Sequence, residues 1–313
     1  MTNEIKLNNI YPLFDLDPIA GFCILYVLLK NKIDIIDIHS PKFYWLCVFL
    51  GRLLSKRVFI TRNVEYRKKG IKKFINRYLY KMCNGVICIS QKIKNGLIED
   101  FKLPEKKVKV IYGNLKISDQ VMPKDIRISY GISKNTILLS IIGRIERNKG
   151  QDFAVKVLYE LFKKGYDCKL FIVGANEDKK FYSELTKMIE DMNLSNKIIF
   201  TGFVENVMDY IYSSDVILCC SLFEGIPRSV IESLLIGIPV VSTPAVRMEE
   251  IPLDSKYLSL LFIVDRDVQK FVEKIQYVIE TRLTKDKILN NYNFGISKLS
   301  DGVNEYLDFY TSV

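Results

Sequence analysis

Short runs of β-branched and apolar residues alternate with longer amphipathic segments along most of the 313 residues. Residues 136–142 and 168–174 are two such runs, and the amphipathic segment 151–164 separates them. A short apolar run followed by a helix-length segment predicts a βα unit, and repeated βα units build a parallel sheet. The chain is therefore predicted to be an α/β protein.

The same pattern predicts two Rossmann-like domains, because a polar stretch with few strand signals, residues 114–133, divides the alternation. We place the domains at residues 1–118 and 119–296, and expect a final helix in residues 297–313 to return to the first domain. The expected strands are 33–39, 57–61, 85–90, 108–112, 136–142, 168–174, 197–201, 215–220, 239–243 and 258–264. The expected helices are 18–30, 41–54, 69–82, 91–101, 151–164, 179–192, 207–213, 228–236, 268–282 and 298–310.

The cysteines and the lengths of the apolar runs indicate in which cellular compartment the protein is expected. Seven cysteines form no CxxC pair, and a single histidine is present to join them, which argues against a zinc site and for a reducing cytosol. The longest apolar runs, 19–29 and 43–50, fall short of the roughly 20 residues that span a bilayer. With no signal peptide at the N-terminus, we expect a cytoplasmic protein.

The net charge of +10 is concentrated in the first part of the chain. Residues 1–120 hold 22 Lys and Arg against 10 Asp and Glu, whereas the remainder holds 24 against 26. The density is highest in a predicted amphipathic helix over residues 67–82. Its basic residues, with Arg62 just before them, are Arg67, Lys68, Lys69, Lys72, Lys73, Arg77 and Lys81, and its apolar ones are Ile71, Phe74, Ile75, Tyr78 and Leu79.

Three interpretations of this basic helix are open. It packs on the core with a solvated basic face, it contacts anionic lipid headgroups, or it binds nucleic acid. No nucleic-acid recognition motif accompanies the charge, so we expect no nucleic-acid partner and keep the first two interpretations.

A candidate phosphate loop follows the run 136–142. Gly143 and Arg144 come directly after it, and Lys149 and Gly150 precede the next predicted helix. Ligands of parallel sheets bind beyond the carboxyl ends of the strands, where glycine admits a diphosphate and Arg and Lys supply donors. Basic βα loops without a ligand are also common, so this motif alone does not establish a site.

A second loop, after the strand 215–220, carries two glutamates eight positions apart. Glu224 precedes a predicted helix and Glu232 lies about one turn inside it, with a turn at Gly225–Pro227 between them. Backbone N–H groups at the helix start suit phosphate, and carboxylates beside them suit sugar hydroxyls. The alternative is that Glu224 caps the helix and Glu232 is a solvated helical residue.

Together these motifs resemble the family 4 glycosyltransferases, whose GT-B fold has two Rossmann-like domains facing each other across a cleft. The resemblance rests on Gly143-Arg144 with Lys149-Gly150, on 200–204, on Glu224-x7-Glu232 and on 237–242. It implies that Arg144 and Lys149 hold the donor diphosphate, that Glu232 binds the ribose hydroxyls and that Glu224, as a catalytic residue, faces the transferred sugar. Gly143 would let the backbone approach the diphosphate. The resemblance further implies that the backbone of Gly202, Phe203 and Val204 borders the base, and that Gly225, Ile226 and Pro227 border the sugar and phosphate.

In the first domain, the strand 34–40 resembles the family's strand that ends in a histidine at the cleft, which makes His39 a candidate catalytic residue. The alternative is that this single histidine has a structural role only. Arg62 stands where many family members have a histidine, so proton transfer there is not expected. About 40 residues precede His39, which is short for the family's first strands and glycine-rich loop. We therefore expect either that the first domain is shortened or that the chain is a truncated product.

The resemblance implies retaining transfer from a UDP- or GDP-sugar to a glycan or polyprenyl-linked acceptor, without an essential metal or other cofactor. The resemblance also implies a role in surface-polysaccharide synthesis. The basic charge of residues 1–120, concentrated on a helix with an apolar stripe, predicts a peripheral location at the inner face of the cell membrane. A catalytically inactive nucleotide-sugar-binding partner is the alternative. An NAD-dependent oxidoreductase is disfavoured because no GxGxxG follows any predicted strand.

Overall fold

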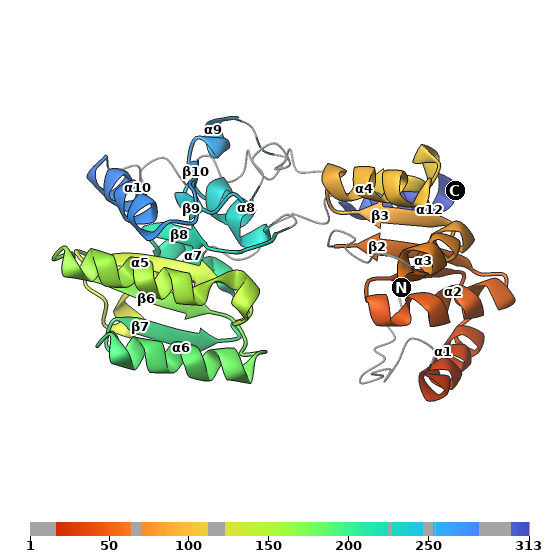
Figure 1. The fold of residues 1–313 in the computed structure, drawn as a ribbon, viewed down its shortest axis with the longest axis horizontal. Helices are drawn as coiled ribbons and strands as arrows, with labels where there is room; N and C mark the ends of the chain where they lie inside the picture. The colour runs from red at the N-terminus through yellow and green to blue at the C-terminus, as the bar shows by residue number, and fades with distance from the viewer. Residues whose placement is uncertain are drawn as a thin grey trace. The chain divides into compact units, whose positions relative to one another are not determined.

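The computed structural model describes residues 17–63, 71–111, 123–224, 227–246, 253, 255–281 and 302–312. The chain divides into two compact units: unit 1 holds residues 1–114 and 301–313, and unit 2 holds residues 115–300. Each unit is built on one parallel sheet with helices packed against it (Figure 1). The α/β alternation predicted from the sequence is present in both.

Unit 1 contains a four-stranded sheet in the order β1-β2-β3-β4. Its strands are β1 (Ile35–Ile38), β2 (Arg57–Arg62), β3 (Gly85–Cys88) and β4 (Val108–Val110). Its described helices are α1 (Pro18–Lys30), α2 (Tyr44–Leu53), α3 (Ile71–Met82), α4 (Gln91–Phe101) and α12 (Gly302–Ser312). Asp17 and Ser90 cap α1 and α4 by accepting hydrogen bonds from backbone N–H groups of the first turn.

Alternate residues of β2 face opposite layers, as the period of two in a strand requires. Val58 and Ile60 pack in one cluster with residues of α2, α3 and α4. Phe59, between them, packs in a second cluster with Phe309 of α12. Gly85 of β3 makes room for this contact, since a Cβ there would lie 2.8 Å from the Phe309 ring. Helix α12 therefore covers the face of the sheet opposite to α2–α4.

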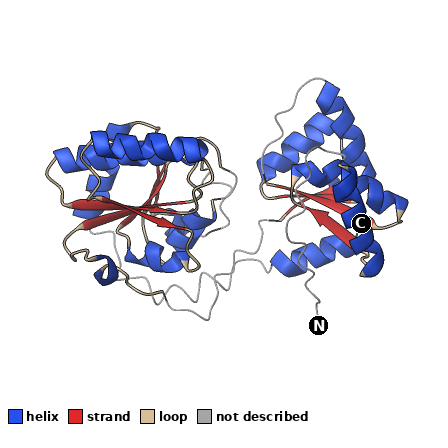
Figure 2. Cartoon of the chain, turned by 90° about the horizontal axis from the view of Figure 1, so that it is seen from below, coloured by secondary structure: helices blue, strands red, loops and turns tan. Residues whose placement is uncertain are grey.

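Unit 2 contains a six-stranded parallel sheet in the order β10-β9-β8-β5-β6-β7. Its strands are β5 (Ile137–Ile142), β6 (Cys168–Val173), β7 (Ile198–Gly202), β8 (Val216–Cys219), β9 (Val240–Ser242) and β10 (Leu261–Ile263). Its described helices are α5 (Gln151–Lys163), α6 (Lys179–Asp191), α7 (Val207–Ser213), α8 (Arg228–Leu235), α9 (Ser255–Leu258) and α10 (Val268–Glu280). Helices lie on both faces of this sheet (Figure 2).

The strand order of unit 2 defines where a ligand is expected to bind. The chain runs from β5 outward through β6 to β7, and then returns to β8 on the other side of β5. Helices α5, α6 and α10 contribute to one apolar cluster, whereas Tyr210 of α7 packs on Phe171 in another. The order therefore reverses between β5 and β8, and open α/β sheets bind ligands at such a switch point, beyond the carboxyl ends of the strands.

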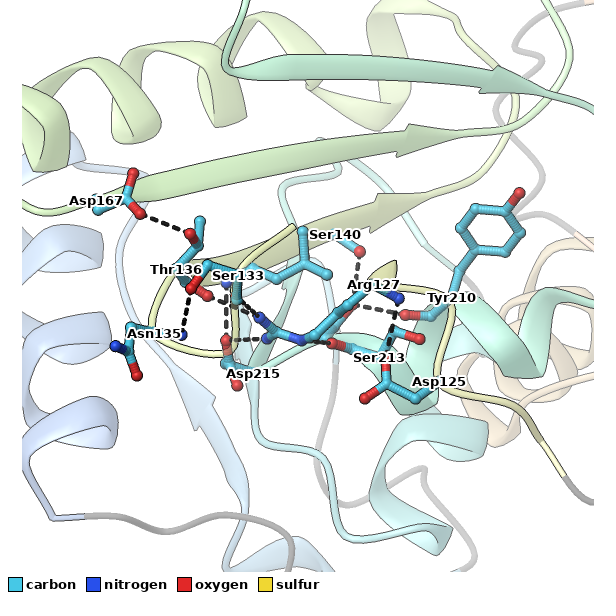
Figure 3. Close-up of polar contacts among 12 residues, drawn as sticks. Asp125, Arg127, Ser133, Asn135, Thr136, Ser140, Asp167, Tyr210, Ser213 and Asp215 are labelled. Atoms are coloured by element: carbon cyan, nitrogen blue, oxygen red, sulfur yellow. Dashed lines mark hydrogen bonds and ion pairs between the residues drawn. The ribbon is translucent and has the colours of Figure 1, made fainter. Parts of the chain in front are cut away.

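Arg127 anchors the opposite, amino-terminal edge of the same two strands. Its guanidinium donates to the carbonyl oxygens of Ser213 at 2.9 Å and Thr136 at 2.8 Å, and pairs with Asp215 at 2.5 Å. The same Asp215 carboxylate oxygen accepts from the Leu138 N–H of β5 at 2.8 Å. This buried arginine thus ties the segment before β5 to the start of β8 (Figure 3).

Candidate functional site

The loops after β5 and β8 are joined to each other at the switch point. The Leu222 N–H donates to the Asn148 carbonyl oxygen at 2.8 Å, and the Asn148 side-chain amide donates to the Phe223 carbonyl oxygen at 3.0 Å. The first loop is thereby held against the second by hydrogen bonds in both directions. Asn148 was not among the residues predicted from the sequence, because a bond of this kind depends on which two loops meet.

Two predicted donor-site residues meet in this pair of loops. Lys149 Nζ lies 2.6 Å from Glu224 Oε1, and Ser221 Oγ donates to the same oxygen at 2.5 Å. Lys149 and Glu224 are half-buried, and Ser221 is buried. The Glu224 carboxylate is therefore fixed by a cation and a hydroxyl, at the position where the resemblance places the transferred sugar.

Two glycines allow the close backbone approaches that form the site. Gly150 has φ +71°, and a Cβ there would lie 2.3 Å from the carbonyl oxygen of Cys220, just beyond β8. Gly174, after β6, has φ +147°, and a Cβ there would lie 2.1 Å from the Gly143 carbonyl oxygen. Only glycine fits these contacts without a shift of the backbone. The aliphatic part of the Lys149 side chain packs on Gly143, and its Cε would lie 3.3 Å from a Cβ added at that glycine.

Arg144, which follows Gly143 in the chain, presents its guanidinium to solvent. Its side chain is 58% exposed, and its contacts with Glu177 and Glu146 are long, at 3.4 and 3.5 Å. The main chain at Arg144 is fixed by a hydrogen bond, because the buried Gln151 side chain donates to the Arg144 carbonyl oxygen at 2.9 Å. Gln151 was missed from the sequence, where it stood only as the first residue of a helix.

The second glutamate is paired within its own helix. Glu232 lies on α8, is half-buried, and accepts from Arg228 Nε at 2.8 Å. Burial raises the pKa of Glu232, and the Arg228 charge opposes that effect. Pro227 precedes α8 as its N-terminal cap residue. Gly225 and Ile226, also predicted for the donor site, lie outside the described residues.

The third predicted segment follows β7, at the same carboxyl-terminal edge of the sheet. Gly202 ends the strand with φ +68°, and the Phe203 side chain after it is 79% exposed. Val204 packs in the apolar cluster with Tyr130 and Tyr210. An exposed aromatic ring at a loop anchored by its neighbours is suited to stacking on a planar group such as a base.

In unit 1, His39 follows β1 and its imidazole pairs with Asp37, with Nε2 at 3.2 Å from Oδ2. The hydrogen bond to Asp37 raises the pKa of His39. Arg62 is buried and its guanidinium lies over the Tyr44 ring at 5.9 Å. Arg62 is thus buried at the carboxyl end of β2, whereas His39 is exposed just after the carboxyl end of β1.

The predicted basic helix is α3, whose described part begins at Ile71. Arg67, Lys68 and Lys69 lie outside the described residues. Phe74, Ile75 and Tyr78 of α3 are exposed, although Leu79 and Tyr80 are buried in the core. Across the described ranges, no helix combines the length and apolar character needed to cross a bilayer.

Comparison with known proteins identifies the class. A solved structure of Anabaena HepE in complex with UDP and glucose superimposes with a TM-score of 0.76 and 18% identity, over 94% of this chain and 82% of that one. Two Rossmann-like units with this match define a GT-B fold, which confirms the predicted fold class. Residues 123–293 match the family model for glycosyl transferases group 1, and residues 4–113 match that for glycosyltransferase family 4. The chain therefore belongs to these glycosyltransferase families, as the motif resemblance predicted.

Two relatives show how the chain compares in length. An uncharacterized glycosyltransferase of Methanocaldococcus jannaschii is 28% identical over 236 residues, which is 72% of this chain and 53% of the relative. The N-acetylgalactosamine-N,N'-diacetylbacillosaminyl-diphospho-undecaprenol 4-alpha-N-acetylgalactosaminyltransferase of Campylobacter jejuni is 26% identical over 238 residues, 74% of this chain and 60% of the relative. The matches thus span between half and two thirds of these relatives' length.

Proposed function

We propose that the chain is a retaining glycosyltransferase that transfers a sugar from a UDP- or GDP-sugar to a polyprenyl-diphosphate-linked glycan. Unit 2 binds the donor, and unit 1 binds the acceptor. Arg144 and Lys149 contact the donor diphosphate, Glu232 accepts hydrogen bonds from the ribose, and Glu224 contacts the transferred sugar. Phe203 stacks beside the base.

The observation that carries this proposal is the meeting of Lys149, Glu224 and Ser221 at the switch point of the unit 2 sheet. A diphosphate needs fixed cationic donors where charge develops as the bond to the sugar breaks, and Lys149 and Arg144 supply them. A sugar hydroxyl needs a fixed acceptor, and Glu224 supplies it. Both requirements are met by two loops that are tied together at Asn148.

The acceptor class is supported by the Campylobacter jejuni relative, whose name gives it a diphospho-undecaprenol-linked sugar as its acceptor. It is also supported by unit 1 itself. Helix α3 carries basic residues beside exposed Phe74, Ile75 and Tyr78, a combination that suits the headgroup region of an anionic bilayer. We therefore propose that unit 1 docks on the inner face of the cell membrane, where a lipid-linked acceptor lies.

Arginine, lysine and helix N-termini replace a divalent ion in this proposal, so no metal is essential. Transfer should then proceed at the same rate in excess EDTA as in buffer with added Mg²⁺ or Mn²⁺. A rate that falls in EDTA and returns with one of these ions would contradict this part of the proposal.

The proposed function is tested by presenting the full chain with labelled UDP- and GDP-sugars and a short-chain polyprenyl-diphosphate glycan. Formation of an elongated lipid-linked product, with the anomeric configuration of the donor retained in its NMR spectrum, is the expected result. Donor binding by calorimetry without product from any acceptor would favour the catalytically inactive binding partner instead. An inverted linkage would contradict the retaining mechanism.

A further inference from the structure

Three side chains from three separate segments converge on the Asp37 carboxylate in unit 1. Thr61 Oγ1 of β2 donates to Oδ1 at 2.8 Å, and the Tyr310 hydroxyl of α12 donates to Oδ2 at 2.6 Å. His39 Nε2 lies 3.2 Å from the same Oδ2. The Asp37 side chain is 15% exposed and that of His39 is 58% exposed, so the carboxylate is enclosed while the imidazole is open to solvent.

Tyr310 is held firmly enough to act as an anchor. Its ring packs on Phe59 with ring centroids 4.7 Å apart, and the preceding Phe309 fills the space left by Gly85. Phe59 and Phe309 are buried, so the backbone of α12 is fixed against the sheet. A residue 273 positions downstream thereby sets the place of a carboxylate in the first described strand.

We propose that Asp37 is a positioning residue for sugar transfer: anchored by Thr61 and Tyr310, it engages His39 through Nε2 and so directs Nδ1 toward the substrate. The proposal rests on the proposed function, sugar transfer by this chain, and on His39 as the catalytic residue that the sequence predicts for unit 1. A histidine with one ring nitrogen occupied by a carboxylate has a fixed tautomer and ring orientation, and its other nitrogen is left for the substrate.

The charges around Asp37 agree with this assignment. Burial of the Asp37 carboxyl opposes its ionisation, but the hydrogen bonds from His39, Tyr310 and Thr61 together lower its pKa. The other titratable groups that face it are Tyr306 on α12 and Tyr44 on α2, with Arg62 of β2 next to Tyr44. Burial raises the pKa of both tyrosines, so they are neutral near pH 7. Asp37 is therefore the anion that the imidazole meets.

Because the hydrogen bond to Asp37 raises the pKa of His39, a larger share of the imidazole is protonated at neutral pH than for an exposed histidine. The imidazolium donates from Nδ1 as well as from Nε2. Directed by Asp37, it can donate a hydrogen bond to an oxygen that gains negative charge during transfer. The expected ligand chemistry at His39 is thus an anionic phosphate or developing oxyanion.

The chain's single histidine makes a direct test possible, because the imidazole NMR signals of an untagged full-length protein belong to His39 alone. In the wild type, we expect its titration midpoint to lie above 6.5. Asp37→Asn should lower that midpoint, because the hydrogen bond and charge that raise it are lost. Asp34→Asn is the matched control: it removes the same charge three residues away, and its side chain is 90% exposed and paired with Lys56 at 3.7 Å. It should leave the midpoint unchanged.

Transfer kinetics complete the test. Asp37→Asn should lower kcat/KM at least about tenfold and move to lower pH the limb on which kcat/KM falls as His39 loses its proton, while calorimetric UDP affinity stays at the wild-type value. Tyr310→Phe keeps the ring on Phe59 and removes only the hydroxyl, so it should lower kcat/KM by a smaller factor without unfolding the chain. It serves as the second variant where Asp37→Asn fails to fold.

Each outcome bears on one proposal or the other. An identical His39 midpoint in the wild type and Asp37→Asn would overturn the pairing, and a shifted midpoint with unchanged kcat/KM in both variants would overturn the positioning role. Failure of the proposed function looks different: the wild type would transfer no sugar to any acceptor. The shifted midpoint in that case would still support the pairing of Asp37 with His39.

Discussion

Lys149 Nζ lies 2.6 Å from Glu224 Oε1, so the cation proposed for the diphosphate and the carboxylate proposed for the sugar are paired with each other. The pair is half-buried, and Ser221 adds a hydroxyl donor to the same carboxylate oxygen. A diphosphate that approaches Lys149 must share its ammonium with Glu224, because one ammonium has three donors. A change at either residue is therefore expected to alter the other's interactions.

Glu224→Gln should lower kcat while the affinity for UDP or GDP stays the same or rises. The amide cannot replace the charge that faces the sugar, whereas Lys149 loses its competing carboxylate and becomes more available to the diphosphate. Calorimetry and steady-state kinetics measure the two effects separately. Glu160→Gln, which breaks an exposed pair with Lys163, is the matched control and should change neither. Loss of nucleotide affinity with turnover per bound donor preserved would show that the role is misassigned.

Arg144→Ala should weaken nucleoside diphosphate binding by roughly 1.5–3 kcal/mol, the range for hydrogen bonds to charged groups. Arg147 offers a close control, because its side chain is 59% exposed against 58% for Arg144, and it pairs with Glu184. Arg147→Ala changes the net charge equally but removes a side chain directed to α6, so its effect should be small. Equal calorimetric affinities in the wild type and Arg144→Ala would refute the placement of the diphosphate.

Most of the fold follows from local sequence signals. The run 137–142 and the helix 18–30 were predicted to within one residue, because apolar periodicity and an Asp-Pro start mark them clearly. The predicted helix ends differ from the observed ones where the chain changes conformation without a change in the polarity of its residues. Residues 41–43 form a 3₁₀ turn before α2 rather than its first turn, and the last helix ends at residue 312 rather than 310.

The site was predicted only in part, for a physical reason. Arg144, Lys149, Glu224 and Glu232 carry recognisable motifs, but their partners become visible only when loops distant in sequence meet. Ser221, Asn148 and Gln151 bond across such loops. Tyr310 could not be connected with Asp37 from the sequence, since 273 residues separate them and no periodicity links a terminal helix to a strand end.

Glu232 should make nucleotide binding sensitive to mildly acidic pH. Burial raises its pKa, so it takes up a proton at a higher pH than an exposed glutamate and the carboxylate that accepts from the ribose is lost earlier as pH falls. The affinity for UDP should fall over that range, whereas that for 2′,3′-dideoxy-UDP should stay nearly constant. Glu232→Gln should remove the difference between the two ligands.

The same pKa shift sets the sign of the effect of Glu232 on stability. A raised pKa in the folded state means that folding favours the protonated form, so stability from this group is present at low pH and is lost as pH rises through the folded pKa. Glu232→Gln should therefore maintain or raise the melting temperature at pH 7. A clearly lower melting temperature at pH 7, with no change at pH 4, would contradict this sign.

Arg127→Ala should destabilise unit 2 by roughly 2–4 kcal/mol, because it leaves the carbonyls of Ser213 and Thr136 and the Asp215 carboxylate without their buried donor. This loss is set below the roughly 3–5 kcal/mol of a fully buried pair because the Asp215 side chain is 26% exposed. Urea unfolding measures the loss. The nucleotide affinity of the folded fraction should be unchanged, because Arg127 lies at the edge of the sheet opposite to the proposed donor site. A variant that unfolds at the wild-type urea concentration would contradict the anchoring role.

The last prediction concerns membrane docking through α3. Residues 1–120 carry 22 basic and 10 acidic residues, and α3 exposes Phe74, Ile75 and Tyr78 next to part of this charge. Each basic residue near an anionic surface is worth about 1 kcal/mol, and the exposed aromatic side chains add apolar burial in the headgroup region. We expect the full chain to co-sediment with vesicles that contain phosphatidylglycerol, less in high salt, and only weakly with phosphatidylcholine vesicles.

Two variants separate the electrostatic and apolar contributions to this docking. Lys73 bonds to Asp100 at 2.5 Å and is left intact, so the charge variant changes Lys68, Lys69 and Lys72 to Glu. It should abolish binding to anionic vesicles, and a matched variant on unit 2 should retain it. That control changes three exposed lysines to Glu: Lys156, Lys164 and Lys187.

Replacement of Phe74, Ile75 and Tyr78 by Ser should leave salt-sensitive binding but reduce the binding that persists at high salt, since apolar insertion is not screened. Binding that ignores lipid charge, salt and the triple lysine change would mean that unit 1 does not dock through this helix, and its charge would then be free to steer an anionic soluble acceptor.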